Sequence, residues 1–188
     1  MRLHRLPALV LVLLSLSSQL AHTQTVEVSK DDFKCLDDMT PVRGFFVDNL
    51  LGDLQATLQV ANSENGGVYP VGSVVQLVPT EVMVKREKGY NAVTKDWEFF
   101  ELEVSEQGSE IKVHGAFEVV NKFGGNCFAC HIKARAEWDM ICEQDHGCDP
   151  ITLPNGMILS QEMIKGVQAA DPRCKTSTTD TASLQQLS

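Results

Sequence analysis

The sequence predicts an α+β fold in which an antiparallel β-sheet is flanked by helices. Four segments between residues 73 and 117 are rich in β-branched and aromatic residues and are separated by turn residues, a pattern typical of successive antiparallel strands. Before them, apolar residues recur every three or four positions, which is the period of a helix. After them, a serine that can cap a helix precedes a second such stretch. A chain of 188 residues with these elements is long enough to bury the core of one domain.

The chain begins with the features of an export signal. Arg2 and Arg5 precede an apolar run at residues 6–14, and small or polar residues follow as far as Ala21. This order is typical of a secretory signal peptide, and the run is too short to span a membrane. We therefore expect residues 1–23 to be removed and the remaining chain to be periplasmic or otherwise exported, and soluble, without a membrane span.

The charge of the chain excludes two classes of partner. The whole chain has 16 basic and 25 acidic residues, a net charge of −9. Without residues 1–23, which contain two arginines and no acidic residue, 14 basic residues remain against 25 acidic ones, a net charge of −11. Nucleic acids and anionic membranes bind basic surfaces, so neither is an expected partner. An acidic surface can steer a cationic protein, but it also simply keeps exported proteins in solution.

The first expected element is one amphipathic helix that starts near Arg43 and ends before the turn-rich residues 62–67. Its apolar positions have helical spacing: Phe46, Val47, Leu50, Leu51, Leu54 and Leu58. The four strands then follow in order: residues 73–78, 81–86, 97–104 and 110–117, with a hairpin turn at 105–109.

Alternation within the strands predicts which side chains share a face. In the fourth strand, Ile111, Val113, Gly115 and Phe117 are expected on one face. In the third, Phe100 is expected to share a face with its alternate neighbours in the strand. An antiparallel sheet of this kind is expected to have one packed face and one wetter face.

Two helices are expected after the sheet. Residues 131–140 have the composition of a short helix, and Ser160 can cap a last helix that runs to about Ala170 before Asp171 and Pro172 stop it. The tail, residues 175–188, is rich in Ser, Thr and Gln and is expected to be disordered. Residues 24–174 are thus expected to form a single domain.

The most specific motif is the run from Cys127 to His131, which reads C-x-x-C-H. In this spacing two thiols can add to the vinyl groups of one haem while the histidine binds its iron, so Cys127 and Cys130 are candidates for covalent haem attachment and His131 for the proximal iron ligand. One haem c per chain is expected, since the sequence contains no internal repeat. Two alternatives remain open: a zinc site completed by Cys142, His146 or Cys148, and ordinary disulfides.

The other four cysteines, Cys35, Cys142, Cys148 and Cys174, are candidates for structural disulfides. Four cysteines permit three pairings. Cys142 and Cys148 are close enough in sequence to close a small loop, which would leave Cys35 to join Cys174 and link the two ends of the domain.

The identity of a sixth iron ligand is open from the sequence. A methionine or a second histidine in this position gives an electron carrier, whereas an empty position gives a haem that binds or transforms small ligands. The candidates are Met83, Met140, Met157, His114 and His146.

The order of motifs resembles the cytochrome P-460 and cytochrome c′-beta family. The resemblance rests on Tyr69–Val75 (YPVGSVV), Met83–Lys85 (MVK), Asp96–Phe100 (DWEFF) and the C-x-x-C-H of Cys127–His131. It spans about residues 67–142. It does not extend to the N-terminal amphipathic stretch or to the cysteine-bracketed loop after the haem motif.

The resemblance implies a cytochrome c′-beta-like fold: a β-rich homodimer with one high-spin haem per subunit, His131 as the only protein ligand, and an open distal face lined by the sheet. One branch of the family oxidises hydroxylamine, using a lysine cross-linked to the haem and a distal carboxylate. The other binds nitric oxide and similar gases in an apolar pocket capped by phenylalanine.

The residues favour the gas-binding branch. The strand at 73–78, where a cross-linking lysine is expected, has none, although Lys85 and Lys88 follow in or near the next strand. Carboxylates could come from three positions: Glu98, Glu101 and Glu118. Our distal-pocket candidates are likewise three: Phe100, Phe117 and Glu118.

We therefore expect a five-coordinate c-type cytochrome that binds a small gaseous or nitrogenous ligand such as nitric oxide and has a redox protein partner. The alternatives are a haem oxidoreductase acting on hydroxylamine-like compounds, which leaves enzymatic activity open, and a six-coordinate electron carrier. A disulfide-stabilised exported β-protein without haem is the alternative from another class.

Overall fold

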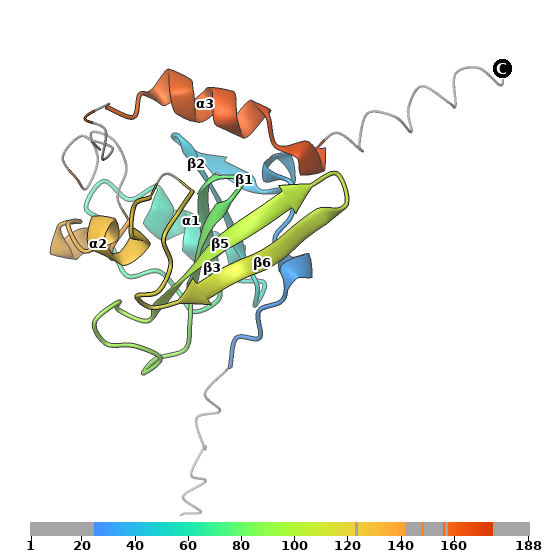
Figure 1. Ribbon diagram of the computed structural model, residues 1–188. Helices are drawn as coiled ribbons and strands as arrows, with labels where there is room; N and C mark the ends of the chain where they lie inside the picture. The colour runs from blue at the N-terminus through green and yellow to red at the C-terminus, as the bar shows by residue number, and fades with distance from the viewer. Residues whose placement is uncertain (1–24, 123, 142–147, 149–155, 157, 175–188) are drawn as a thin grey trace, which may run out of the picture.

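The structure is a computed structural model that describes residues 25–122, 124–141, 148, 156 and 158–174 (Figure 1). The expected signal peptide, residues 1–23, and the expected disordered tail, residues 175–188, lie outside the described residues. No helix within the described ranges is long and apolar enough to cross a membrane.

The described residues form an α+β fold built on a six-stranded antiparallel sheet (Figure 1). The strands lie side by side in chain order, each paired with the next. Their bounds are β1 Thr40–Val42, β2 Phe45–Asn49, β3 Ser73–Val78, β4 Glu81–Lys85, β5 Trp97–Ser105 and β6 Gly108–Gly115. The four strands predicted from the sequence are therefore confirmed as β3 to β6, and the chain has two more.

The predicted single N-terminal helix is wrong in its first half. Residues 45–49 form β2, in which Phe45, Val47 and Asn49 are buried while the intervening side chains are half-buried. Gly52, with a φ of +83°, turns the chain, and the helix α1 spans only Leu54–Ala61. The apolar residues with three- and four-residue spacing therefore belong partly to a strand and partly to a helix. Their spacing alone does not show where the strand ends and the helix begins.

Both faces of the central strands are buried, in contrast to the predicted wet face. One face, here the α2 face, includes Met83, Trp97 and Phe99. It is covered by α1 and by residues of the chain after the sheet, which are Val119, Cys127, Met140 and Ile141. The other, here the N-terminal face, includes Val84, Phe100 and Leu102, and it is covered by Val26, Phe33, Leu36 and Met39 of the N-terminal segment. The sheet is therefore a layer between two coverings.

A β-bulge in β6 corrects the predicted face of its apolar residues. Glu101 pairs with Val113 but Leu102 pairs with Ile111, so Lys112 is an extra residue on β6. The bulge turns Val113 to the α2 face and Ile111 to the N-terminal face. Strand β5 keeps its alternation, and Phe100 shares a face with Leu102 and Val104, as predicted.

Of the two helices expected after the sheet, the first differs from the prediction and the last is confirmed. Helix α2 spans Cys127–His131, followed by a 3-10 turn η3 at Ala136–Trp138. The predicted helix at 131–140 is wrong because Asp139 and Met140 have positive φ values of 50° and 67°, which no helix contains. Helix α3, Gln161–Ala169, has the predicted Ser160 cap, whose side chain accepts a hydrogen bond from the Met163 amide.

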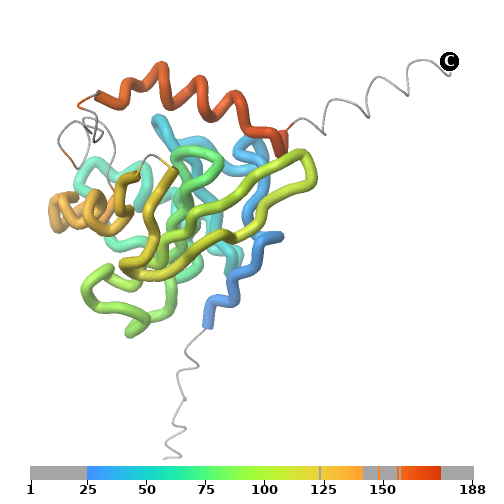
Figure 2. Tube along the Cα trace, in the orientation of Figure 1, coloured from blue at the N-terminus to red at the C-terminus, as the bar shows by residue number. Residues whose placement is uncertain are grey.

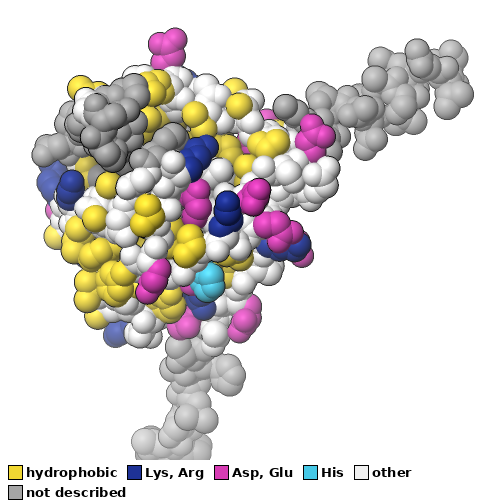
Figure 3. All heavy atoms as spheres, in the orientation of Figure 1, with side chains coloured by type: hydrophobic (Ala, Val, Ile, Leu, Met, Phe, Trp, Pro, Cys, Tyr) yellow, Lys and Arg dark blue, Asp and Glu magenta, His cyan; other side chains and the backbone are white. Residues whose placement is uncertain are grey.

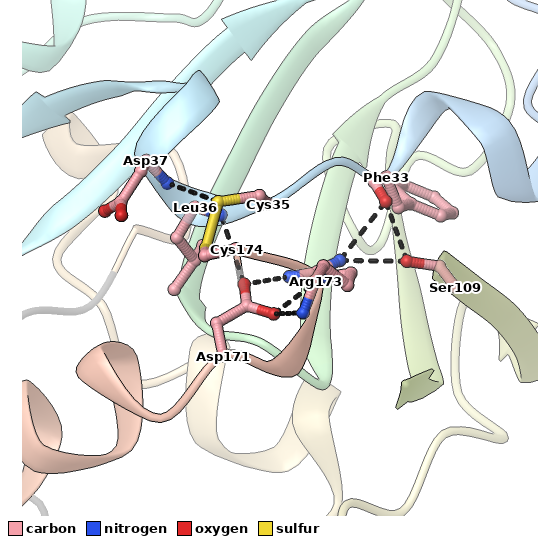
Figure 4. Close-up of a disulfide and its surroundings, with 8 residues drawn as sticks. All are labelled: Phe33, Cys35, Leu36, Asp37, Ser109, Asp171, Arg173 and Cys174. Carbon is pink, nitrogen blue, oxygen red and sulfur yellow. Dashed lines mark hydrogen bonds and ion pairs between the residues drawn. A yellow bond between two sulfur atoms is a disulfide. The ribbon is translucent and has the colours of Figure 1, made fainter. Parts of the chain in front are cut away.

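The two ends of the described chain meet at the N-terminal face. Two short 3-10 turns, η1 at Lys30–Asp32 and η2 at Leu36–Asp38, lead into the sheet. Figure 2 shows the end of α3 beside this N-terminal segment, and Figure 4 shows the Cys35–Cys174 disulfide that joins them.

An ion pair lies next to this disulfide. The Arg173 guanidinium donates two hydrogen bonds to the carboxylate of Asp171, which also accepts from the Leu36 amide, and it reaches Ser109 of β6 (Figure 4).

Candidate functional site

Helix α2 is fixed at its start by Asn126. The Asn126 Oδ1 accepts a hydrogen bond from the Ala129 amide at 2.9 Å, and its Nδ2 donates to the Phe117 carbonyl at 2.8 Å. The Cys127 amide donates to the carbonyl of Val119 at 3.0 Å. These bonds satisfy amides that a helix start leaves without partners and hold the C-x-x-C-H run against the strand-like segment before it.

Cys127 and Cys130 are free thiols, whereas Cys35, Cys148 and Cys174 are in disulfides. Cys127 is buried in the core of the α2 face and Cys130 is exposed. The predicted pairing of Cys35 with Cys174 is present. Cys142, which the sequence would pair with Cys148, lies outside the described residues.

The imidazole of His131 is held in one tautomer. Its Nδ1 lies 2.7 Å from the carbonyl oxygen of Met140, and because a carbonyl only accepts, Nδ1 is the protonated nitrogen. The ring packs against Phe99 of β5, with 5.4 Å between centroids. Burial lowers the pKa of His131, the Met140 hydrogen bond opposing this in part, so the ring is neutral and Nε2 carries a lone pair.

This donor set fits a c-type haem. Thioether bonds need two free thiols, and axial ligation needs a neutral imidazole whose other nitrogen donates to a carbonyl. Cys127, Cys130 and His131 meet these requirements. The zinc alternative has less support, because Cys148 is in a disulfide and is therefore not a thiolate ligand, while Cys142 and His146 lie outside the described residues.

Two glutamates lie on the α2 face beside Cys127. Glu81 of β4 and Glu101 of β5 are directly opposite each other in the sheet, on the same face as Met83 and Phe99. The atoms Glu81 Oε1 and Glu101 Oε2 are buried and have no hydrogen-bond partner. Both carboxylates interact electrostatically with Cys127.

Burial changes the acidity of this group. It raises the pKa of Glu81 to about 7, with a further contribution from the charge of Glu101, and it also raises the pKa of Glu101. Burial, followed by the two carboxylates, raises the pKa of Cys127 to about 12. Of the two acids, Glu101 was a candidate from sequence and Glu81 was missed. Glu81 could have been found from the pairing of β4 with β5, because that pairing places it directly opposite Glu101.

The other end of the same face carries a buried ion pair. Lys85 Nζ lies 2.7 Å from Asp139 Oδ2 and 2.7 Å from the carbonyl of Lys95, and it sits 5.0 Å from the ring centroid of Trp97. Burial lowers the pKa of Lys85, and Asp139 opposes that change. Lys85, a candidate for a haem cross-link, therefore neutralises Asp139, which sequence reasoning missed. Lys88 is exposed.

The sequence candidates for the distal pocket are dispersed. Phe117 lies beside α2, edge-on to Phe128 with 4.9 Å between centroids. Phe100 is on the N-terminal face, packed against Phe33 at 5.1 Å. Glu118 is exposed and accepts from the Phe117 amide, and Glu98 lies on the N-terminal face, where it bonds Arg86 and His114.

An exposed apolar surface adjoins the motif. Phe117 is 43% exposed, and Val120 and Ile132 are each 51% exposed. Figure 3 shows hydrophobic side chains gathered on the part of the surface near α2 and the end of β6. Such exposed apolar side chains suit contact with a flat apolar group.

The candidates for a sixth iron ligand also separate. Met83 and Met140 are in the same core cluster as Cys127. His114 is on the other side, stacked on Phe100 at 5.5 Å. Met157 and His146 lie outside the described residues.

Comparisons with protein-family models, with curated proteins and with solved structures find no match for this chain. The residues described above are therefore the basis for assigning a function.

Proposed function

We propose that this chain is an exported c-type cytochrome that carries one haem and binds small ligands such as nitric oxide at its iron. One observation carries the proposal: two free thiols three residues apart share a capped helix with an imidazole whose Nδ1 is bound to a carbonyl. The Cys35–Cys174 disulfide agrees with an oxidising compartment outside the cytoplasm. The resemblance to the cytochrome P-460 and cytochrome c′-beta family points the same way, toward a cytochrome c′-beta-like fold.

Each residue of the motif has a separate role. Cys127 and Cys130 hold the haem through thioether bonds, and His131 binds through Nε2. The carbonyl of Met140 fixes the orientation of the imidazole and increases its basicity as a ligand. When bound, the haem supplies an iron centre that takes up small diatomic or nitrogenous ligands.

An oxidoreductase acting on hydroxylamine-like compounds is the second candidate, and the acids on the α2 face favour it. Such chemistry needs a carboxyl group that takes up and releases protons near neutral pH. Glu101 and Glu81 lie on the same face as the haem motif and have raised pKa values. A six-coordinate electron carrier would instead use Met83 or Met140, which share the core with Cys127.

The test is expression in a host with a haem-attachment system. We expect haem that stays on the polypeptide after denaturation, and its loss or loosening when Cys127 or Cys130 is changed to Ala. His131→Ala should keep covalent haem but change its axial ligation. A colourless wild-type protein, or covalent haem in a variant lacking both cysteines, would overturn the proposal.

Spectra of the reduced protein separate the three haem functions. A high-spin spectrum that shifts on adding nitric oxide or carbon monoxide is expected. A low-spin spectrum that neither gas changes would identify the electron carrier. Turnover of hydroxylamine that is lost in Glu101→Gln, with covalent haem retained, would identify the oxidoreductase.

A further inference from the structure

We propose that Glu81 and Glu101 form a proton-transfer pair that promotes thioether formation at Cys127. The inference rests on the proposed function, because it concerns how this chain takes up its haem. Three features support it: the placement of the two carboxylates, the burial that raises their pKa values, and the burial of Cys127 but not of Cys130.

The placement follows from the register of the sheet. Residues directly opposite in an antiparallel pair have Cβ atoms about 5 Å apart, so the side chains of Glu81 and Glu101 are neighbours on the α2 face. Asn121 connects this pair to the haem motif, since its side chain hydrogen-bonds to Glu81 and accepts from the Gly125 amide at 2.9 Å. The turn that leads into Cys127 is therefore tied to the acid pair.

Burial keeps the pair partly protonated near neutral pH, because it raises the pKa of Glu81 to about 7 and also raises the pKa of Glu101. Two adjacent buried carboxyl groups do not both ionise readily, because burial and their mutual repulsion oppose the second charge. Three neighbours favour the charged carboxylates and so partly oppose the rise in pKa: Lys122 for both glutamates, Lys112 for Glu101 and Asn121 for Glu81. From α2, the titratable group that interacts with the pair is Cys127. The unpartnered Glu81 Oε1 and Glu101 Oε2 remain available for proton transfer.

Cys127 needs such help and Cys130 does not. The thiolate is the nucleophile of cysteine, and the burial that raises the pKa of Cys127 to about 12 keeps this thiol in its protonated form at pH 7. Solvent cannot readily take the proton of a thiol that is buried. Cys130 is exposed, so solvent reaches its thiol directly.

The proposed step conserves atoms and electrons. The carboxylate of the pair accepts the proton of Cys127 Sγ as the sulfur bonds the α-carbon of a haem vinyl group. The carboxylic acid of the pair donates its proton to the β-carbon, and the π bond of the vinyl group is consumed. The pair ends with one proton, as it began, and no external oxidant or reductant takes part.

The test measures attachment at each cysteine separately. Purified haem-free protein is incubated with dithionite-reduced protohaem at pH 7, and thioethers at Cys127 and Cys130 are followed over time by peptide mass spectrometry. The variant Glu81→Gln/Glu101→Gln keeps the size of both side chains but removes both ionisable groups. We expect attachment at Cys127 to slow at least about tenfold, within the usual range for general acid–base assistance, with the rate at Cys130 unchanged.

A matched control is the buried carboxylate of Glu98, which lies on the same strand as Glu101 but on the opposite face of the sheet. Glu98→Gln should leave both rates unchanged, and thermal unfolding of each variant checks that it is folded. Equal rates at Cys127 in wild type and the double variant would overturn the inference, and so would a wild type that attaches haem at neither cysteine in this assay. The proposed function is decided independently, by covalent haem in protein from a host with an attachment system.

Discussion

At the scale of single residues, the burial of Glu81 makes stability depend on pH. Its pKa is about 7 in the folded chain against an ordinary value of 4.5. The contribution of Glu81 to the free energy of unfolding is therefore complete below about pH 4.5 and is lost as the pH rises through 7. Between these values the unfolded chain releases a proton that the folded chain still holds. Glu81→Gln should remove this loss and make the protein about 3 kcal/mol more stable than wild type at pH 8.

Urea unfolding at pH 4.5, 6 and 8 measures this difference. The control is Glu103→Gln, because Glu103 is on the same sheet and its side chain is 69% exposed. Wild type and Glu103→Gln should lose stability in parallel over this range. The same slope in Glu81→Gln would show that Glu81 ionises normally in the folded protein.

The buried pair of Lys85 and Asp139 behaves differently from a surface pair. Lys85→Met leaves Asp139 as an uncompensated buried charge and should cost about 3–5 kcal/mol. Adding Asp139→Asn to this variant should recover part of the loss, since the side-chain oxygen of asparagine can still accept the hydrogen bond from the backbone N–H of Tyr69. Lys112→Met, which removes an exposed partner of Glu103, should cost less than about 1 kcal/mol. Equal losses from the two lysine changes in urea unfolding would contradict the burial of the first pair.

At the scale of elements, the C-x-x-C-H motif depends on the cap of a five-residue helix. Asn126→Ala removes both the bond to the Ala129 amide and the bond to the Phe117 carbonyl and should cost about 1 kcal/mol. Ser160→Ala removes the corresponding cap of α3 and should cost a similar amount. Only the first change should lower the fraction of protein with covalent haem, measured after denaturing electrophoresis. Equal haem content in both variants would show that α2 forms without its cap.

Sequence could predict the elements whose signals are local. Ser160 and the Asp171-Pro172 pair bound α3 closely, and turn residues separate β3 to β6. Strand β2 was missed because its apolar residues run into those of α1 without a break in spacing. The bulge at Lys112 depends on the register with β5, which a single strand does not encode.

The same distinction applies to the candidate site. The C-x-x-C-H motif is contiguous, so Cys127, Cys130 and His131 could be identified without a structure. Glu81 and Asp139 reach the α2 face through strand pairing and through a turn with positive φ, and neither is visible in a local pattern. The assignment of Phe100 to the opposite face likewise required knowing which side residues 119–141 cover.

At the scale of the whole molecule, the two faces of the sheet have different roles. The α2 face contains the thiols, the imidazole and the acid pair, whereas the N-terminal face is covered by the segment that includes Cys35 of the Cys35–Cys174 disulfide. Because the disulfide and the haem motif lie on opposite sides of the sheet, stability from the first should be separable from the chemistry of the second.

The disulfide joins positions 139 residues apart, so its removal should lower stability without affecting haem attachment. A crosslink over so long a loop restricts the unfolded chain strongly, and loss of a native disulfide typically costs about 2–5 kcal/mol. Cys35→Ser/Cys174→Ser should still fold, because the Asp171 carboxylate continues to bind Leu36 and Arg173 continues to bind Ser109. Urea unfolding should show the loss, while mass spectrometry should show thioethers at Cys127 and Cys130 as in wild type. Arg173→Met in the presence of the disulfide is the matched change at the same junction, and it should weaken the attachment of α3 without altering the thioethers. Loss of covalent haem in the double serine variant under conditions where it remains folded would show that the two faces are coupled.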